Sequence, residues 1–184
     1  MTLYVMTEEH RDFLTRCNLR TYPNIADARR RADDILDIAG TFFDPLFFVG
    51  PTPDRPKYYL GAFLDITGRA HLEVSAIGFV GASFYRDCRD WLGYMFDELG
   101  VKLIEDSVWV GDTKKEWLMR GLGFKKGGLI PDKLDIPGHG PVAALAMYIR
   151  AEEYHAADRR WFCDKLREHQ RRERLRKNRS VANG

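Results

Sequence analysis

Apolar residues recur at helical spacing in two stretches of the first forty residues. Thr7 is placed to cap a first helix, with two glutamates near its positively polarised end. Asn24 is placed to cap a second helix over Ile25–Ala39, and Gly40 is placed to end it. The apolar face of this second helix consists of Ile25, Ala28, Ala32, Ile35, Leu36 and Ala39. Both patterns predict amphipathic helices that cover a core.

After residue 40 the pattern becomes typical of strands. Thr41–Val49 is aromatic and β-branched, and the proline-rich turn Gly50–Pro56 follows it. Lys57–Ile66 and Ala70–Ile77 predict two strands joined by a turn at Thr67–Arg69. Polar and apolar residues alternate in the second of these strands, which is typical of an antiparallel meander with one covered face.

Helices and strands alternate in the second half of the chain. A helix beginning at the cap Ser83 is predicted because apolar residues recur at helical spacing as far as Leu99, and Gly100 is placed to end it. The later predicted elements are a strand over Val101–Val110, a short helix over Thr113–Leu122, a strand after Gly123-Phe124, a loop over Pro131–Pro141 and a last strand over Val142–Arg150.

Length and composition indicate one globular domain. The chain has 184 residues, of which 45% are hydrophobic and 30% charged, enough for one sizeable core. No apolar run approaches the roughly 20 residues that cross a bilayer, and the N-terminus does not resemble a secretory signal. The three cysteines are far apart, which argues for a reducing compartment and against disulfides or a zinc site. We therefore expect a cytoplasmic protein.

Positive charge is concentrated at the C-terminal end. Residues 151–184 hold ten basic and six acidic residues, whereas the rest of the chain is slightly acidic. We predict a domain over residues 1–150 and a basic helical arm over 151–184. The arm is either a solvated tail or a segment that becomes ordered on a nucleic acid or an acidic protein surface. Its predicted contact residues are Arg171, Arg172, Arg174, Arg176, Lys177 and Arg179.

The segment Ser107–Phe124, SVWVGDTKKEWLMRGLGF, resembles a strand–helix segment of the Gcn5-related N-acyltransferases. Leu118, Gly123 and Phe124 match that family, and Asp112 stands where the family has an asparagine. The order of elements over residues 1–150 is also similar. The resemblance implies an α/β (α+β) fold with a mixed, mostly antiparallel sheet flanked by helices. It also implies that Ala70–Ile77 and Val101–Val110 run parallel and diverge to open a cleft.

A narrower resemblance concerns the run VWVGDT within this segment. It is similar to a run in small internal virion proteins of short-tailed phages, which resemble acyltransferases without being established enzymes. This resemblance implies phage structural proteins or nucleic acid as partners and a place in the host cytoplasm or the virion.

The family's second hallmark is a loop that holds the pyrophosphate of acetyl-CoA on backbone amides and a helix N-terminus. The corresponding stretch here is Gly78–Ser83. Gly81 matches the family pattern, but Gly78 lacks the basic or amide side chain of the first position, which predicts weak binding of acetyl-CoA. A tight turn without a ligand explains the same glycines. The cofactor-binding residues that the resemblance implies are Ala76, Ile77, Gly78, Gly81, Ala82, Ser83 and Asp112.

Catalytic candidates are few. Acyl transfer to an amine needs a base for the amine and an acid for the leaving sulfur. Glu73 is the candidate base, unless it simply faces solvent. Met119 stands where many family members have a tyrosine acid, and it cannot donate a proton. His139 lies in the predicted loop, and Trp109 and Trp117 either line a pocket or fill the core. No metal-ligand cluster or dinucleotide motif is found in the sequence.

Two hypotheses follow. The first is a non-catalytic or vestigial acyltransferase fold that serves as a phage virion or accessory protein and needs no cofactor. The alternative is an active N-acyltransferase that uses acetyl-CoA or another acyl-CoA. The altered positions Gly78 and Met119 favour the first, and the sheet order keeps the second open.

Overall fold

A seven-stranded sheet organises the part of the chain that the computed structural model describes, residues 3–19, 22–40, 46–77, 82–136, 140–156 and 171. Its strand order is β1-β2-β3-β4-β5-β7-β6. The strands are β1 (Tyr4–Val5), β2 (Phe48–Gly50), β3 (Tyr58–Leu64), β4 (Arg69–Ala76), β5 (Leu103–Trp109), β6 (Lys125–Ile136) and β7 (Gly140–Arg150). The helices are η1 (Glu8–His10), α1 (Arg11–Asn18), α2 (Ile25–Ala39), α3 (Ala82–Gly93) with its π-helical end η2 (Tyr94–Glu98), α4 (Thr113–Gly121) and α5 (Ala151–Ala156).

The sheet is antiparallel except between β4 and β5, which run parallel, as predicted. Helix α3 lies between these two strands in the chain, because a parallel connection needs a crossover. The fold prediction, a mostly antiparallel mixed sheet flanked by helices, is confirmed.

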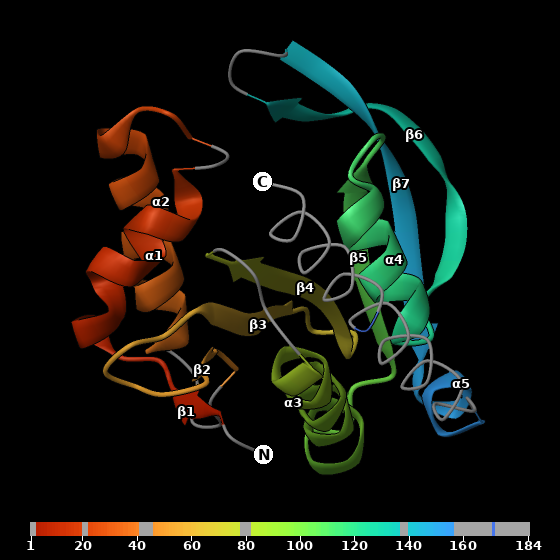
Figure 1. Cartoon of the computed structure of the whole chain (residues 1–184). Coiled ribbons are helices and arrows are strands. Elements are labelled where there is room, and N and C mark those ends of the chain that lie inside the picture. Colours follow the sequence, from red (N-terminus) through yellow and green to blue (C-terminus); the bar gives the residue numbers. More distant parts are fainter. Residues whose placement is uncertain are drawn as a thin grey trace.

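Helices cover both faces of the sheet. Side chains alternate along β4, so that Leu72 and Val74 face α3 and α4, whereas Glu73 between them contacts Arg31 of α2 on the other face. Figure 1 shows α1 and α2 side by side near the N-terminal strands, with the long β6–β7 hairpin curving across the opposite side of the molecule. Buried apolar residues of the helices α1–α5 and of the strands β2, β3, β4, β5 and β7 form one core cluster.

The predicted N-terminal helices are confirmed with their caps. Thr7 forms a capping box with His10 at the start of η1, and the Asn24 side chain accepts a hydrogen bond of 2.8 Å from the Ala26 amide. Part of the predicted apolar face of α2 is wrong, because Ile25 is 67% exposed. It lies in the first turn of the helix, beyond the region where α2 packs on the sheet.

The predicted loop over Pro131–Pro141 is wrong at both ends. Strand β6 continues to Ile136 and β7 begins at Gly140. The pairing with β7 shifts register between Ile130 and Leu134, and Asp132 has a φ of 47°. Proline cannot donate to a ladder, but it is tolerated in a bulge on an edge strand such as β6. His139 lies outside the described residues.

The start of α3 also differs from the prediction. The helix begins at Ala82, so Ser83 is its second residue rather than its cap. The helix ends in a π-helical turn, Tyr94–Glu98, and Gly100 follows with a φ of 65°. A positive φ suits glycine, and this position fits the predicted helix stop.

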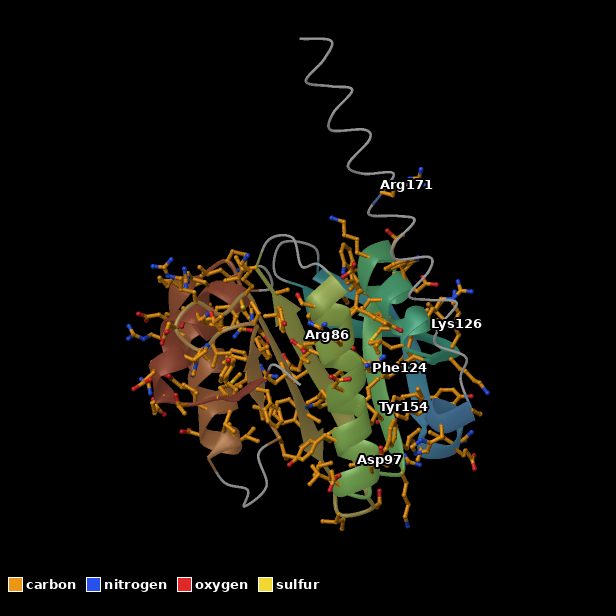
Figure 2. All side chains as sticks on the ribbon, turned by 60° about the horizontal axis from the view of Figure 1, so that its bottom comes forward. Arg86, Asp97, Phe124, Lys126, Tyr154 and Arg171 are labelled. Atoms are coloured by element: carbon orange, nitrogen blue, oxygen red, sulfur yellow. The ribbon has the colours of Figure 1, made fainter. Side chains whose placement is uncertain are left out.

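The C-terminal helix α5 is anchored to α3. Tyr154 is 5% exposed, and its hydroxyl donates to the carbonyl of Arg89 at 2.8 Å. Its ring lies 5.1 Å from the ring of Phe96, and Figure 2 shows Tyr154 beside α3. Of the predicted arm contacts, only Arg171 is among the described residues. It is exposed, and in Figure 2 it lies outside the body of the domain. The boundary predicted at residue 150 stays a prediction.

Candidate functional site

The site begins where β4 and β5 separate. Among the described residues their ladder contains three pairs, of which His71 and Glu105 are the last. Beyond this pair, β4 continues to Ala76 against β3, and β5 continues to Trp109 against β7. Each strand therefore has an inner edge whose backbone amides and carbonyls are not used by the other strand. Such groups need hydrogen-bond partners from water or from a ligand.

Glu73, the candidate base, lies on β4 just past the last pair. The Tyr59 hydroxyl donates to Oε1 at 2.9 Å, and Nη2 of Arg31 lies 3.2 Å from Oε2. The Glu73 side chain is 22% exposed, so the alternative that it faces open solvent is wrong. Burial raises the pKa of Tyr59, and the nearby Glu73 raises it further. Tyr59 therefore acts as a hydrogen-bond donor that orients the carboxylate.

A buried ion pair fixes α4 beside the separated strands. Asp106 is the first residue of β5 beyond the last pair and is 4% exposed. Its Oδ2 lies 2.8 Å from Nζ of Lys115 on α4. Burial raises the pKa of Asp106, whereas the charge of Lys115 opposes that rise. The pair therefore holds the first turn of α4 against β5.

The described cofactor residues implied by the resemblance lie at the start of α4, around the start of α3 and at the end of β4. Asp112 is the N-cap of α4, and its Oδ1 accepts from the Lys115 amide at 3.0 Å. Ser83 lies in the first turn of α3, where its hydroxyl forms a hydrogen bond with Tyr58. Ala76 ends β4, Ile77 follows it, and Ala82 begins α3. The remaining two, Gly78 and Gly81, lie outside the described residues, so the loop itself cannot be placed.

Buried polar contacts hold the first turns of α3 against β3. The Tyr58 hydroxyl donates to the carboxylate of Asp87 at 2.6 Å, and Asp87 is completely buried. Burial and then this carboxylate raise the pKa of Tyr58. The start of α3 is therefore fixed to the sheet on one side of the separated strands, as Lys115 fixes α4 on the other.

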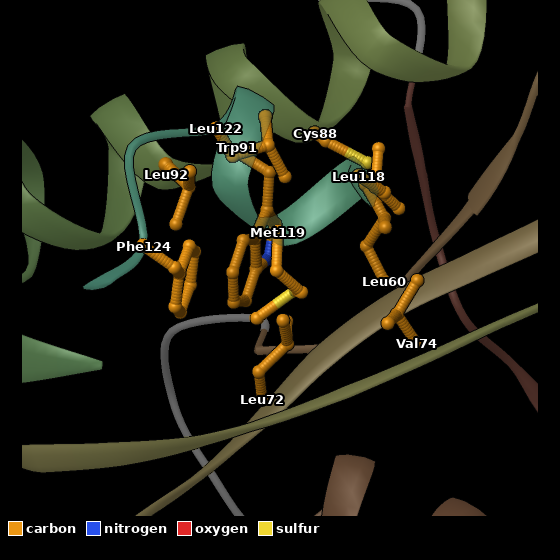
Figure 3. Close-up of a pocket in the computed structure, with 10 residues that line it drawn as sticks. All are labelled: Leu60, Leu72, Val74, Cys88, Trp91, Leu92, Leu118, Met119, Leu122 and Phe124. Atoms are coloured by element: carbon orange, nitrogen blue, oxygen red, sulfur yellow. The ribbon is translucent and has the colours of Figure 1, made fainter. Parts of the chain in front are cut away.

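A small apolar cavity of about 10 Å³ lies between α3, α4 and the sheet. Figure 3 shows its lining, which consists of Leu60, Leu72, Val74, Cys88, Trp91, Leu92, Leu118, Met119, Leu122 and Phe124. Met119 is fully buried there. Burial also raises the pKa of the Cys88 thiol.

Of the two alternatives for Trp109 and Trp117, lining a pocket or filling the core, the second is wrong. Trp109 is 37% exposed and Trp117 is 43% exposed. Trp109 follows Val108 on β5 and points to the face opposite α4. It lies beside Ala144 of β7, which pairs on its other side with Ile130 of β6. Trp109 and Ile130 are 37% and 38% exposed on that face, and Ala144 between them is buried.

Sequence reasoning missed the Asp106–Lys115 pair and the partners of Glu73. One signal was available for the first: Ile104, Asp106 and Val108 alternate inward on an apolar strand, so a carboxylate there needs a partner. The partners of Glu73 come from elements distant in the chain, and nothing in the local pattern indicates them.

Within the described part of the chain, no group of side chains is arranged to hold a metal ion. None of the helices there combines the length and the hydropathy of a membrane-spanning segment.

Comparison with known proteins gives similarity in structure and not in sequence. No family model matches the chain, and no curated protein sequence matches it. Many solved structures match, however. A mutant form of the spermidine N-acetyltransferase SpeG from Vibrio cholerae aligns with a TM-score of 0.66 and 18% identity, covering 83% of this chain and 95% of that one.

Two further solved structures are similar to this chain over most of its length. The ribosomal-protein-S5-alanine acetyltransferase from Vibrio fischeri has a TM-score of 0.64 and 12% identity, covering 83% of this chain and 93% of that one. A putative acetyltransferase has a TM-score of 0.68 and 11% identity, covering 89% and 92%. At these identities the similarity concerns the fold alone: the chain has the Gcn5-related N-acyltransferase fold.

Proposed function

We propose that the protein is an N-acyltransferase that moves an acyl group from acetyl-CoA or another acyl-CoA to an amine. The observation that carries the proposal is the separation of the parallel strands β4 and β5 after His71 and Glu105. A gap of this kind offers backbone donors and acceptors on both sides. The amide-rich arm of an acyl-CoA can pair with them as an additional strand would.

The helices on either side suit the anionic end of such a donor. Helix α3 follows β4 and α4 follows β5, so both begin near the ends at which the parallel strands have separated. Helix N-termini carry partial positive charge and free amides, which favour phosphate. Ala82 and Ser83 belong to the first turn of α3. We assign the pyrophosphate to that turn and to the preceding residues Ile77–Gly81.

The proposed reaction forms a bond between the amine nitrogen and the thioester carbon and breaks the carbon–sulfur bond. Glu73 receives the proton of the amine, directly or through a water, and the CoA sulfur leaves as a thiol after taking up a proton. Each carboxylate oxygen of Glu73 accepts one contact from Tyr59 or Arg31 and keeps a further lone pair. Because the Met119 side chain has no proton that it can donate, we assign the protonation of the sulfur to water.

The structural neighbours favour this enzymatic function over a non-catalytic virion protein. The names of two of them state an amine acceptor, spermidine in one and an alanine of a ribosomal protein in the other. A primary amine is therefore the proposed class of acceptor. The binding of nucleic acid or phage proteins by the basic arm stays a separate proposal, which rests on its charge alone.

The test is thiol release from acetyl-CoA in the presence of a panel of primary amines, including spermidine. We expect amine-dependent release, and Glu73→Gln should lower kcat at least about 100-fold, the lower end of the range for a lost general base. Glu8→Gln is a matched control, because Glu8 is also ion-paired, to Arg11 at 2.6 Å, but lies in the N-terminal turn. If acetyl-CoA binds but no amine causes thiol release, the result would favour the non-catalytic hypothesis instead.

A further inference from the structure

Arg31 of α2 holds a positive charge directly beside the candidate base. Its Nη2 lies 3.2 Å from Oε2 of Glu73, and its guanidinium carbon lies 5.4 Å from the centroid of the Phe63 ring on β3. A guanidinium at this distance is attracted to the face of an aromatic ring. The ring and the carboxylate therefore both hold the guanidinium, and its charge stays at the site.

The guanidinium keeps donors that these two contacts do not use. Arginine has five N–H groups in a planar fork, and among the described residues its one side-chain hydrogen bond is the bond to Glu73. The two side chains are 29% and 22% exposed, so a small solute reaches both. The planar fork matches the two oxygens of a carboxylate. An acceptor molecule can therefore meet the base and an unused cationic donor together.

The charge balance of this pair changes during the proposed reaction. Before the transfer, the positive Arg31 and the negative Glu73 sum to zero. When Glu73 takes up the proton of the amine, the pair carries one net positive charge. Opposite charges attract and like charges repel more strongly as they come closer. The pair therefore favours an acceptor with an anionic group nearby and disfavours one with a second ammonium group.

A second carboxylate on this face of the sheet has less influence. Side chains alternate along β5, and since Asp106 contacts Lys115 of α4, Glu105 points to the opposite face, as Glu73 does. Glu105 is exposed and belongs to the last pair before the strands separate. Water and salt screen an exposed charge. Arg31 touches the base itself, so we expect its charge to decide which acceptor is preferred.

We propose that the acceptor is an amine that also carries a carboxylate, which Arg31 binds while Glu73 receives the proton of the amine. The inference rests on the proposed acyl-CoA-dependent function and specifies its acceptor. The carboxylate accepts hydrogen bonds from the remaining N–H groups of Arg31, and the amine nitrogen lies beside Glu73. Arg31 is then a specificity-determining residue, and polyamines are poor acceptors for this chain.

Three acceptors of equal chain length test the effect of charge: 4-aminobutanoate, butylamine and 1,4-diaminobutane. Each presents a primary amine, and the far end is negative, neutral and positive in turn. Thiol release from acetyl-CoA by the full chain should give a kcat/KM at least about tenfold higher for 4-aminobutanoate than for 1,4-diaminobutane. This is the lower end of the value of a hydrogen bond to a charged group, because Arg31 is partly exposed. Butylamine should lie between them.

Variants of Arg31 show whether this residue causes the preference. Arg31→Met removes the charge and should bring the three kcat/KM values together, whereas Arg31→Lys keeps a charge and should retain their order. Loss of the contact to Glu73 alone would lower all three values equally, so their ratio reports specificity rather than positioning. Arg30→Met is the matched control and should leave the ratio unchanged, because the Arg30 side chain is 75% exposed and pairs with Asp27.

The preference of the unaltered chain decides the question even if Arg31→Met does not fold. Equal values for the three amines, a preference for 1,4-diaminobutane or release with spermidine alone would overturn the inference, and the proposed function would stand. An unchanged ratio in folded Arg31→Met would also overturn it. If no primary amine causes thiol release, the proposed function fails, and this inference fails with it.

Discussion

Lys115→Met should destabilise the protein at neutral pH, because it leaves the Asp106 carboxylate buried without its charge partner. Nζ of Lys115 lies 2.8 Å from Oδ2, and the two side chains are 26% and 4% exposed. Removal of one partner of a buried pair costs about 3–5 kcal/mol of unfolding free energy. Lys115 is partly solvated, so we expect about 3 kcal/mol, the lower end of that range.

The loss of unfolding free energy in Lys115→Met should grow as the pH rises from about 4 to neutrality. Burial raises the pKa of Asp106 above its ordinary value, and Lys115 opposes that rise, so the variant has a still higher folded-state pKa. A raised folded-state pKa means that the unfolding free energy falls as the pH rises from the unfolded-state value, about 3.9, through the folded-state value. The deficit of the variant should therefore be largest at neutral pH and shrink toward about pH 4.

Urea unfolding of both proteins across this pH range measures the effect. Lys114→Met, which removes the exposed neighbouring lysine, is the control and should change the unfolding free energy by no more than about 0.5 kcal/mol. The double variant Asp106→Leu/Lys115→Met should recover most of the loss, because no charge then stays buried. If the loss of unfolding free energy has the same size at every pH, the conclusion that Asp106 is buried with a raised pKa is refuted.

Three other perturbations test the packing and the arm. Gly61→Ala should lower the unfolding free energy by about 1–3 kcal/mol, because its Cβ would overlap the Phe47 ring. Gly128→Ala, whose Cβ would have no other atom within 4 Å, should have a much smaller effect in the same denaturation assay. Tyr154→Phe removes a 2.8 Å hydrogen bond to α3 and should cost about 1 kcal/mol, and an unchanged thermal midpoint would contradict that contact. Truncation after Leu166 should abolish binding to duplex DNA. For the full chain, six phosphate contacts predict a slope of about −5 in log affinity against log salt. Equal binding by the full and the truncated chain would exclude the arm as the DNA-binding segment.

Local patterns predicted the elements that local interactions determine. The cap at Asn24, the helix over Ile25–Ala39 and the stop at Gly100 depend on neighbours within a few residues, and all three were predicted. The parallel arrangement of β4 and β5 was also predicted, but from the family resemblance. The strand that follows Pro131 is not predicted because prolines and glycines cluster over residues 131–141, whereas pairing with β7 maintains the strand across a bulge.

The candidate site depends on contacts between residues that are distant in the chain, and a local sequence pattern does not predict such contacts. Glu73 was singled out, but its partners Tyr59 and Arg31 come from β3 and α2, so its half-buried position could not be foreseen. Among the described residues the buried Trp91 nitrogen has no hydrogen-bond partner, and this depends on which side chains surround it after folding. The exposure of Trp109 follows from the face of β5 on which it falls, opposite to α4.

We propose that an acyl-CoA binds in the gap between β4 and β5. Amide hydrogen exchange of the full chain, measured with and without saturating acetyl-CoA, detects binding at this place. We expect slower exchange along the inner edges past the last shared pair, over Leu72–Ala76 of β4 and Asp106–Trp109 of β5. Exchange in β1 and β2, which lie at the far edge of the sheet, should stay the same. Unchanged exchange in both inner edges, or protection confined to other strands, would contradict the account.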